Sequence, residues 1–332
     1  MRITGPFLLA ILMIAGCNRP VPGLPWPEAN PCNGFTEEPV PEVDSLPRNR
    51  IQGAILASRF STFEDFQSVV KVEYFGKGQT AGSSEAEHST ARLTHCCNGS
   101  YIISEIRSGL DQDDITRARD GNLADKLGLL IHSPYTIANR EEMKKIYWLA
   151  RRRFREFGEG DMAFFDLALH TVSHINTPSL AYKNARDRGE KGYLNTFNHF
   201  IAQAFITSCF SEEIADFIGD MHELKNMPAL VHGKFKPEEL TNPDNNPVDN
   251  YADMLNNEWG QEIGKELKEK YGIGPQTRWT PPLLTNYLND IQQYFSWAFQ
   301  IGFEPFRQDD EVVTRFAHKM NVMLHNIPIN VP

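Results

Sequence analysis

The sequence YLNTFNHFIAQAFITSC, residues 193–209, carries apolar side chains at the spacing of a helix. Its bulky and small apolar residues recur every three or four positions and form one stripe: Phe197, Phe200, Ile201, Ala204 and Phe205. This pattern predicts a helix over about 193–209 that buries its stripe against other elements. We therefore place this helix in the core of the protein.

Further helices are predicted on both sides of this stretch. Ser211 is placed to cap a helix at its N-terminus, and Gly272 to end one that reaches Tyr271. Apolar spacing and capping residues together predict helices at about 62–74, 113–131, 140–157, 162–175, 211–224 and 250–271, and two more that begin at Thr280 and at Asp309 or Asp310.

The expected fold class is mostly α, an irregular helical array with at most a short strand or hairpin near residues 96–106. The sequence shows no internal repeat and no glycine-rich phosphate loop. A single helical domain is expected over residues 51–332, with the motif-bearing core at about 160–272.

The N-terminus has the layout of a secretory signal. Arg2 supplies a positive charge, residues 7–14 are apolar, and small residues precede Cys17. The apolar run is far shorter than the roughly 20 residues that cross a bilayer as a helix. Ile14-Ala15-Gly16-Cys17 resembles the lipobox of bacterial lipoproteins, which implies a signal peptide over 1–16 and lipid on Cys17. The alternative is an ordinary signal peptide that happens to contain a cysteine.

Residues 17–50 are rich in proline, so we expect a tether between the lipid and the domain. Asn18 and Arg19 follow Cys17, and no aspartate lies next to it. By resemblance to the sorting of enterobacterial lipoproteins, the outer membrane is favoured over the inner membrane. Lipid on Cys17, at roughly 0.8 kcal/mol per buried CH₂, is thus the expected contact with the membrane.

The overall charge argues against nucleic acid as a partner. The 332 residues carry a net charge of −10, with 41% hydrophobic residues and no long basic run. Nucleic-acid-binding domains usually present a basic patch or stripe, so we expect no nucleic acid.

Besides Cys17, the chain contains Cys32, Cys96, Cys97 and Cys209. An exported chain meets an oxidising compartment, which favours at least one disulfide. A bond between adjacent cysteines is strained, so Cys96 or Cys97 is expected to pair with Cys32 or Cys209, and the connectivity stays open. A zinc site is the alternative, although no Cys-x-x-Cys spacing is present.

Asp166, His170 and His174 lie four residues apart on one predicted helix, which places them on one face. Imidazoles one turn apart can bind one metal ion, so these three are candidate ligands of a divalent cation together with His199 or His222. The competing interpretation is a polar helix edge with hydrogen-bonded histidines.

Three further motifs are polar. Asn195 and His199 share a face beside the apolar stripe of residues 193–209, and His222-Glu223 follows on the next predicted helix. The third motif places polar residues and a glycine three or four apart on one face: Asp253, Asn256, Asn257 and Gly260. A glycine inside a helix costs about 1 kcal/mol relative to alanine, so Gly260 indicates close helix packing.

The order Asn-x-x-x-His, His-Glu, Asp-x-x-Asn-Asn-x-x-Gly over about 190–272 resembles a family of helical bacterial domains of unknown function. Members occur in secreted or surface proteins and in toxin-like chains. The family has Arg where this chain has Asn198, and His where it has Leu255. The resemblance implies one polar cluster, made of Asn195, His199, His222, Glu223, Asp253, Asn256 and Asn257.

Three hypotheses of function follow. The first is a cell-envelope hydrolase of peptidoglycan or phospholipid, with His199, His222, Glu223 and Asp253 catalytic and with Asn195, Asn256 and Asn257 binding substrate. The second is a metal-dependent version of this enzyme. The third is a non-catalytic lipoprotein whose buried polar network has a structural or binding role. An active site requires the cluster to open on a cleft, whereas a structural network is sealed.

Two common hydrolase motifs are missing from the sequence. Position 226 is Asn, so His222-Glu223 does not begin a His-Glu-x-x-His zinc motif, and no Gly-x-Ser-x-Gly is present.

Overall fold

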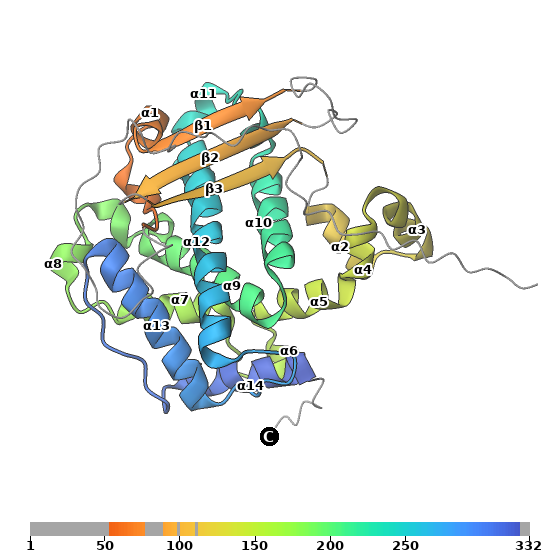
Figure 1. Ribbon diagram of the computed structural model, residues 1–332, viewed down its shortest axis with the longest axis vertical. Helices are drawn as coiled ribbons and strands as arrows, with labels where there is room; N and C mark the ends of the chain where they lie inside the picture. Colours follow the sequence, from red (N-terminus) through yellow and green to blue (C-terminus); the bar gives the residue numbers. More distant parts are fainter. Residues whose placement is uncertain (1–52, 77–88, 98–99, 110–111, 326–332) are drawn as a thin grey trace, which may run out of the picture.

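The computed structural model describes residues 53–76, 89–97, 100–109 and 112–325 (Figure 1). Helices make up most of this part of the chain, and one small sheet lies at its edge, so the prediction of a mostly α fold is confirmed. The predicted signal peptide over 1–16, the lipidated Cys17 and the tether over 17–50 lie outside the described residues.

The sheet has three antiparallel strands in the order β1-β2-β3. β1 is Val70–Phe75, β2 is Thr90–Cys97 and β3 is Ser100–Arg107, with Val70 opposite His95 and Leu93 opposite Ser104. β2 and β3 form the hairpin expected near residues 96–106. The observed pairing is longer than expected, because it begins at Thr90 and ends at Arg107.

The prediction of a helix over 62–74 is correct for its first turn and wrong after it. Thr62 does cap a helix, because its Oγ1 accepts a hydrogen bond from Asp65 N at 3.1 Å. However, this helix, α1, covers only Phe63–Gln67, and β1 follows it. The β-branched Val70 and Val72 suit a pleated strand, and pairing with β2 outweighs the local helical spacing.

A series of short helices follows the sheet. The helix expected at 113–131 is divided, because Asn122 accepts a hydrogen bond from Asp125 N at 3.0 Å and caps a second helix. The helix expected at 140–157 also ends early, at Leu149. The elements of this region are α2 Gln112–Asp120, α3 Leu123–His132, α4 Pro134–Ala138, α5 Arg140–Leu149, α6 Phe154–Phe157, α7 Phe164–Ser173 and α8 Pro178–Ala181.

The longer helices come from the second half of the chain. Ser211 and Thr280 cap their helices as predicted, and Gly272 ends another in the left-handed conformation at φ 59°. These helices are α9 Asn195–Cys209, α10 Glu212–Asn226, α12 Pro247–Tyr271, α13 Pro281–Phe299 and α14 Glu311–His325, and the short helix α11, Pro237–Thr241, precedes α12. Further single-turn segments lie at Ala57–Arg59, Ala185–Arg188, Glu190–Leu194 and Pro228–Val231.

α9 and α12 pack closely at the centre of the molecule, with α10 against both (Figure 1). A Cβ atom on Gly260 would lie 2.5 Å from Phe200 O, and one on Gly264 would lie 2.6 Å from Ala204 O. Only glycine allows this approach, so the close packing expected at Gly260 is confirmed.

The apolar stripe of α9 is buried as predicted. Phe197 stacks on Phe295 of α13, with ring centroids 4.0 Å apart, and Phe205 lies 4.5 Å from Tyr287. The stripe therefore fixes α9 between α12 and α13, which leaves its polar edge facing α10 and the start of α12.

In the part of the chain that the structure describes, none of the helices combines the length and the apolar character needed to cross a membrane.

Candidate functional site

Three helices bring the predicted polar residues together. α9 contributes His199, α10 contributes Glu223, and α12 contributes Asp253. His199 Nδ1 lies 3.8 Å from Glu223 Oε1, and His199 Nε2 lies 3.4 Å from Asp253 Oδ2. The prediction that these three side chains lie within one side-chain length of one another is confirmed.

Two asparagines orient the cluster. Asn195 Nδ2 donates to both oxygens of Asp253, at 2.8 and 2.9 Å, and so fixes the carboxylate plane. Asn257 Oδ1 lies 3.1 Å from His199 Nδ1. Each ring nitrogen of His199 therefore has an oxygen beside it, Asn257 on one side and Asp253 on the other. The neutral ring donates to one of these oxygens, and which one depends on the nitrogen that carries the proton.

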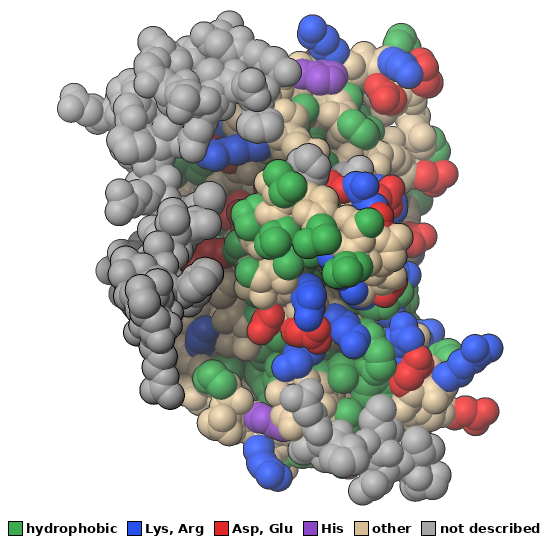
Figure 2. Space-filling view, turned by 90° about the vertical axis from the view of Figure 1, so that its right-hand side faces the viewer, with side chains coloured by type: hydrophobic (Ala, Val, Ile, Leu, Met, Phe, Trp, Pro, Cys, Tyr) green, Lys and Arg blue, Asp and Glu red, His purple; other side chains and the backbone are tan. Residues whose placement is uncertain are grey.

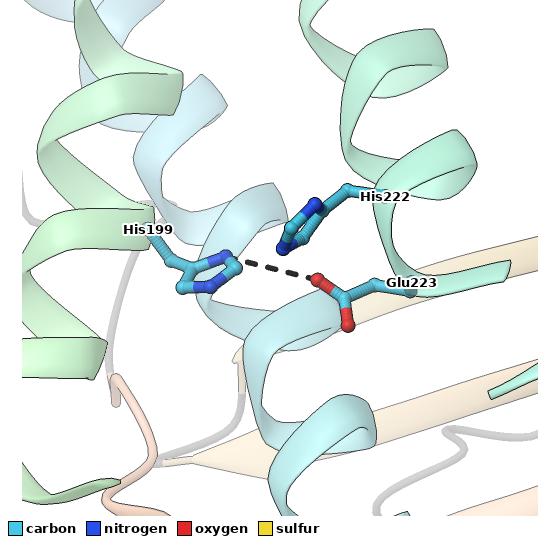
Figure 3. Close-up of side chains that lie close together, drawn as sticks. All are labelled: His199, His222 and Glu223. Carbon is cyan, nitrogen blue, oxygen red and sulfur yellow. Dashed lines mark ion pairs between the residues drawn. The ribbon is translucent and has the colours of Figure 1, made fainter. Parts of the chain in front are cut away.

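His222 and Glu223 both turn toward His199 (Figure 3). One nitrogen or oxygen of each of the three side chains lies within 4.8 Å of the others, and no other group of His, Cys, Asp or Glu in the described ranges meets this spacing for a metal ion. As neighbours on a helix, His222 and Glu223 leave the backbone about 100° apart, and their long side chains overcome this difference in direction.

Glu223 is the unusual member of the cluster. Its side chain is 1% exposed, and neither carboxylate oxygen has a hydrogen-bond partner in the structure. A buried polar atom without a partner costs about 1–3 kcal/mol, and a charged one costs more. The position of Glu223 is therefore poorly explained as a purely structural feature of the protein alone.

The cluster opens on a polar cavity of about 170 Å³. His199 and Asp253 lie on its wall, as predicted, whereas Glu223 is not among the lining residues. The cavity is lined by Lys191, Asn195, His199, His222, Asn226, Asp244, Asn245, Asp249, Asn250 and Asp253. The polar network is thus not sealed, which is the property that distinguishes a site from a structural network.

Burial raises the pKa of each acid in the cluster. The pKa of Asp253 rises to about 7 and that of Asp249 to about 6, and Asp253 adds to the shift of Asp249. Burial also raises the pKa of Glu223 well above its usual range, with further contributions from Asp253 and Asp249. Lys191 Nζ, 2.6 Å from Asp249 Oδ2, opposes these shifts. Three carboxyl groups thus share one site with a single lysine among the cavity residues.

Both histidines of the cluster favour the neutral form. Burial, together with the nearby His199, lowers the pKa of His222 to about 4. Burial also lowers the pKa of His199, against the hydrogen bond with Asn257. Neutral imidazole is the form that binds metal ions, so both rings are ready to act as ligands at neutral pH.

The predicted metal site at Asp166, His170 and His174 is not formed. Arg152 Nε lies 2.9 Å from Asp166 Oδ2, which also accepts from Ala163 N at 2.8 Å. His174 accepts a hydrogen bond from Gln292 at 3.3 Å. Asp166 is thus occupied as a helix cap and ion-pair partner, and the three ligand atoms do not come within 4.8 Å of one another. His199 and His222 instead lie close to Glu223.

Asn256, predicted to bind substrate, lies elsewhere. It is fully buried, and its side-chain amide exchanges two 2.8 Å hydrogen bonds with the backbone N and O of Ile55. It therefore fastens the N-terminal segment of the domain to α12. Asn257 is also outside the cavity lining, and its contact is with His199.

Two charged residues of the site were missed in the sequence. Asp249 lies four residues before Asp253, so the same helical spacing could have included it. Lys191 comes from the single turn before α9, and no pattern in the sequence signals its approach to Asp249.

The disulfide stays a prediction. Cys209 is half-buried and forms no disulfide within the described residues, and Cys32 lies outside them.

Comparison of the chain with protein-family models, with curated proteins and with solved structures finds no match. The arguments on function therefore rest on the site itself.

Proposed function

We propose that this chain is a membrane-anchored lipoprotein of the cell envelope whose helical domain is a divalent-metal-dependent hydrolase. One observation carries the proposal. His199, His222 and Glu223 present three ligand atoms within 4.8 Å of one another, and the oxygens of buried Glu223 have no other partner.

The donor set suits zinc or a similar ion. Two imidazoles and one carboxylate are a known ligand set of catalytic zinc sites, which keep one further position for water. Ligand atoms around tetrahedral zinc are about 3.4 Å apart, given bonds of about 2.0–2.1 Å. Since the ligand atoms lie within 4.8 Å of one another, they need to approach by at most about 1.4 Å to reach this geometry.

The surroundings also favour a cation. Asp253 and Asp249 stand near Glu223, and all three acids have raised pKa values in the metal-free protein. A divalent ion offsets this concentration of negative charge and gives Glu223 a partner. If one ring nitrogen of His199 binds an ion, the oxygen beside the other nitrogen can accept the hydrogen bond that fixes the imidazole.

In this proposal Asp253 is the general base. A bound ion makes water more acidic and polarises the bond to be cleaved. Asp253 lies on the cavity wall, Asn195 holds its plane, and its pKa of about 7 suits proton transfer at neutral pH. It accepts a proton from the attacking water and returns one to the leaving group. Lys191, also on the cavity wall, can stabilise negative charge that develops on the substrate.

The non-catalytic alternative receives less support. A structural network satisfies its buried polar atoms and excludes solvent. Here Glu223 is unsatisfied and the cluster borders a cavity.

The location in the envelope rests on Ile14-Ala15-Gly16-Cys17. Peptidoglycan and phospholipid are the hydrolysable polymers and lipids within reach of an anchored domain, so they are the proposed substrates. Labelled fatty acid should be incorporated into the wild-type chain and not into Cys17→Ser. If Cys17→Ser incorporated the label and still fractionated with membranes, the anchoring proposal would be rejected.

The enzymatic proposal is tested with purified protein, stripped of metal and reloaded with zinc, on peptidoglycan and on phospholipid vesicles. Hydrolysis should require metal and be lost in Glu223→Gln and His222→Ala. His170→Ala is the matched control, because His170 lies on α7 outside the cluster, and it should retain activity. Equal activity of all these variants would overturn the proposal.

A further inference from the structure

Helix α3 exposes most of its apolar side chains. Four of the eleven exposed large hydrophobic residues in the described part of the chain lie on this ten-residue helix, and they are 49–81% exposed: Leu123, Leu127, Leu130 and Ile131. Leu129 alone among its large apolar residues is buried. Such a concentration on one short helix differs from the single apolar residues scattered over an ordinary surface.

The helix belongs to an arm that projects from the domain. α2, α3 and α4 form this arm beside α10 (Figure 1). Apolar side chains gather at the middle of the face on which the arm projects, and Lys and Arg side chains interspersed with acidic ones lie below them (Figure 2). The apolar face of α3 is therefore the outermost part of this side of the molecule.

The helices that follow the arm differ in charge from the whole protein. Residues 140–157 carry a net charge of +4, whereas the arm itself, residues 112–138, carries −1 and the whole chain carries −10. Arg119, Lys126 and Lys144 all lie close enough to Asp120, at the end of α2, to lower its pKa, so cations of α2, α3 and α5 gather at the base of the arm. These cations can meet the headgroups of anionic lipid.

The composition favours lipid over protein as the occupant. Protein interfaces draw most of their affinity from Trp, Tyr and Arg in packed pockets, and leucine is under-represented among such residues. The face of α3 is aliphatic and protruding. Pairing with a second copy through four side chains each falls short of the roughly 1,200–2,000 Å² that a stable interface buries.

We propose that α3 is a membrane-contacting helix, whose face of Leu123, Leu127, Leu130 and Ile131 enters the headgroup region of a bilayer that contains anionic lipid. Interfacial helices place their apolar side about 5–10 Å into this boundary while nearby cations meet the headgroups. The contact is independent of the catalytic proposal. With lipid on Cys17, it provides a second attachment and sets the orientation of the domain on the membrane.

The test uses the full chain bound to vesicles of phosphatidylethanolamine and phosphatidylglycerol with brominated acyl chains. A tryptophan reporter replaces Leu130 on α3, and a matched reporter replaces Leu180 on α8, which is 52% exposed on a different side of the molecule. Emission is compared with that of the parent chain. Bromine should quench the added emission of Leu130→Trp by about threefold and leave that of Leu180→Trp nearly unchanged.

Adding Leu127→Glu and Ile131→Glu to the α3 reporter should abolish its quenching, while circular dichroism stays that of the parent. Replacing phosphatidylglycerol by phosphatidylcholine should weaken the quenching of Leu130→Trp. Unquenched Leu130→Trp on vesicle-bound protein would overturn the proposal, as would failure of the chain to bind vesicles or equal quenching without anionic lipid. A dimer that the two glutamates dissociate, without any bromine quenching, would instead assign the face to a second copy.

Discussion

Glu223→Gln should stabilise the metal-free protein and destabilise the metal-bound protein relative to wild type. The substitution keeps the shape of the side chain and removes its charge. In metal-free protein, Glu223 is buried without a hydrogen-bond partner and near Asp253 and Asp249. Glutamine retains the unsatisfied polar atoms but not the repulsion, so the variant should gain about 1–2 kcal/mol in free energy of unfolding at pH 8.

With metal, wild type should become more stable than the variant. An ion that binds only the folded state stabilises it by about 2.7 kcal/mol at a concentration of 100 times Kd. At roughly 2–4 °C per kcal/mol for a domain of this size, the wild-type Tm should rise by about 5–10 °C. The variant lacks one ligand and should gain much less. It should therefore be more stable than wild type in chelator and less stable in excess zinc.

Thermal unfolding followed by circular dichroism, in EDTA and in zinc, measures both effects. Glu213→Gln is the control, since Glu213 is exposed in the first turn of the same helix, and its Tm and zinc response should match wild type. If Glu223→Gln were less stable than wild type in EDTA and showed the full zinc response, Glu223 would be a structural residue and no ligand.

Other predictions concern pH, packing and cysteine chemistry. Asp253 has a folded pKa of about 7 and an ordinary value of 3.8. The unfolded chain releases this proton at lower pH, so the free energy of unfolding in EDTA, measured by urea titration, should fall by up to about 4 kcal/mol as pH rises from about 4 to 7, and a rise would refute the assignment. Gly260→Ala should destabilise by about 2–3 kcal/mol because its Cβ meets Phe200 O, whereas Gly128→Ala, with open space, should stabilise by up to about 1 kcal/mol in the same unfolding assay. Burial raises the pKa of Cys209 to about 12, so mass spectrometry should find it unmodified by iodoacetamide at pH 8 until urea is added.

The helical core could be predicted because its signals are local. Phe197, Phe200 and Phe205 define the stripe of α9, and Ser211 and Gly272 mark helix ends. β1 could not, because its pairing with β2 depends on residues about twenty positions away. Capping at Thr62 was correct, yet it says where a helix begins and not where it ends.

The polar cluster of the site could be predicted from the sequence, but the choice of metal ligands could not. His199, Glu223 and Asp253 stand at the edges of apolar stripes, so packing the stripes together also joins the polar edges. The metal ligands were assigned to Asp166 and its neighbours because spacing alone does not show which charged groups a face will meet. Arg152, fourteen residues away, forms an ion pair with Asp166 in the folded protein.

The most direct test of the account is calorimetric titration of zinc into the metal-free protein, together with elemental analysis after dialysis. Wild type should bind about one ion per chain, with affinity that rises with pH as protons leave the site. His199→Ala, His222→Ala and Glu223→Gln should each lower the affinity by tenfold or more, and His170→Ala should leave it unchanged. No binding by wild type, or equal binding by all four variants, would contradict the metal centre on which the proposed function depends.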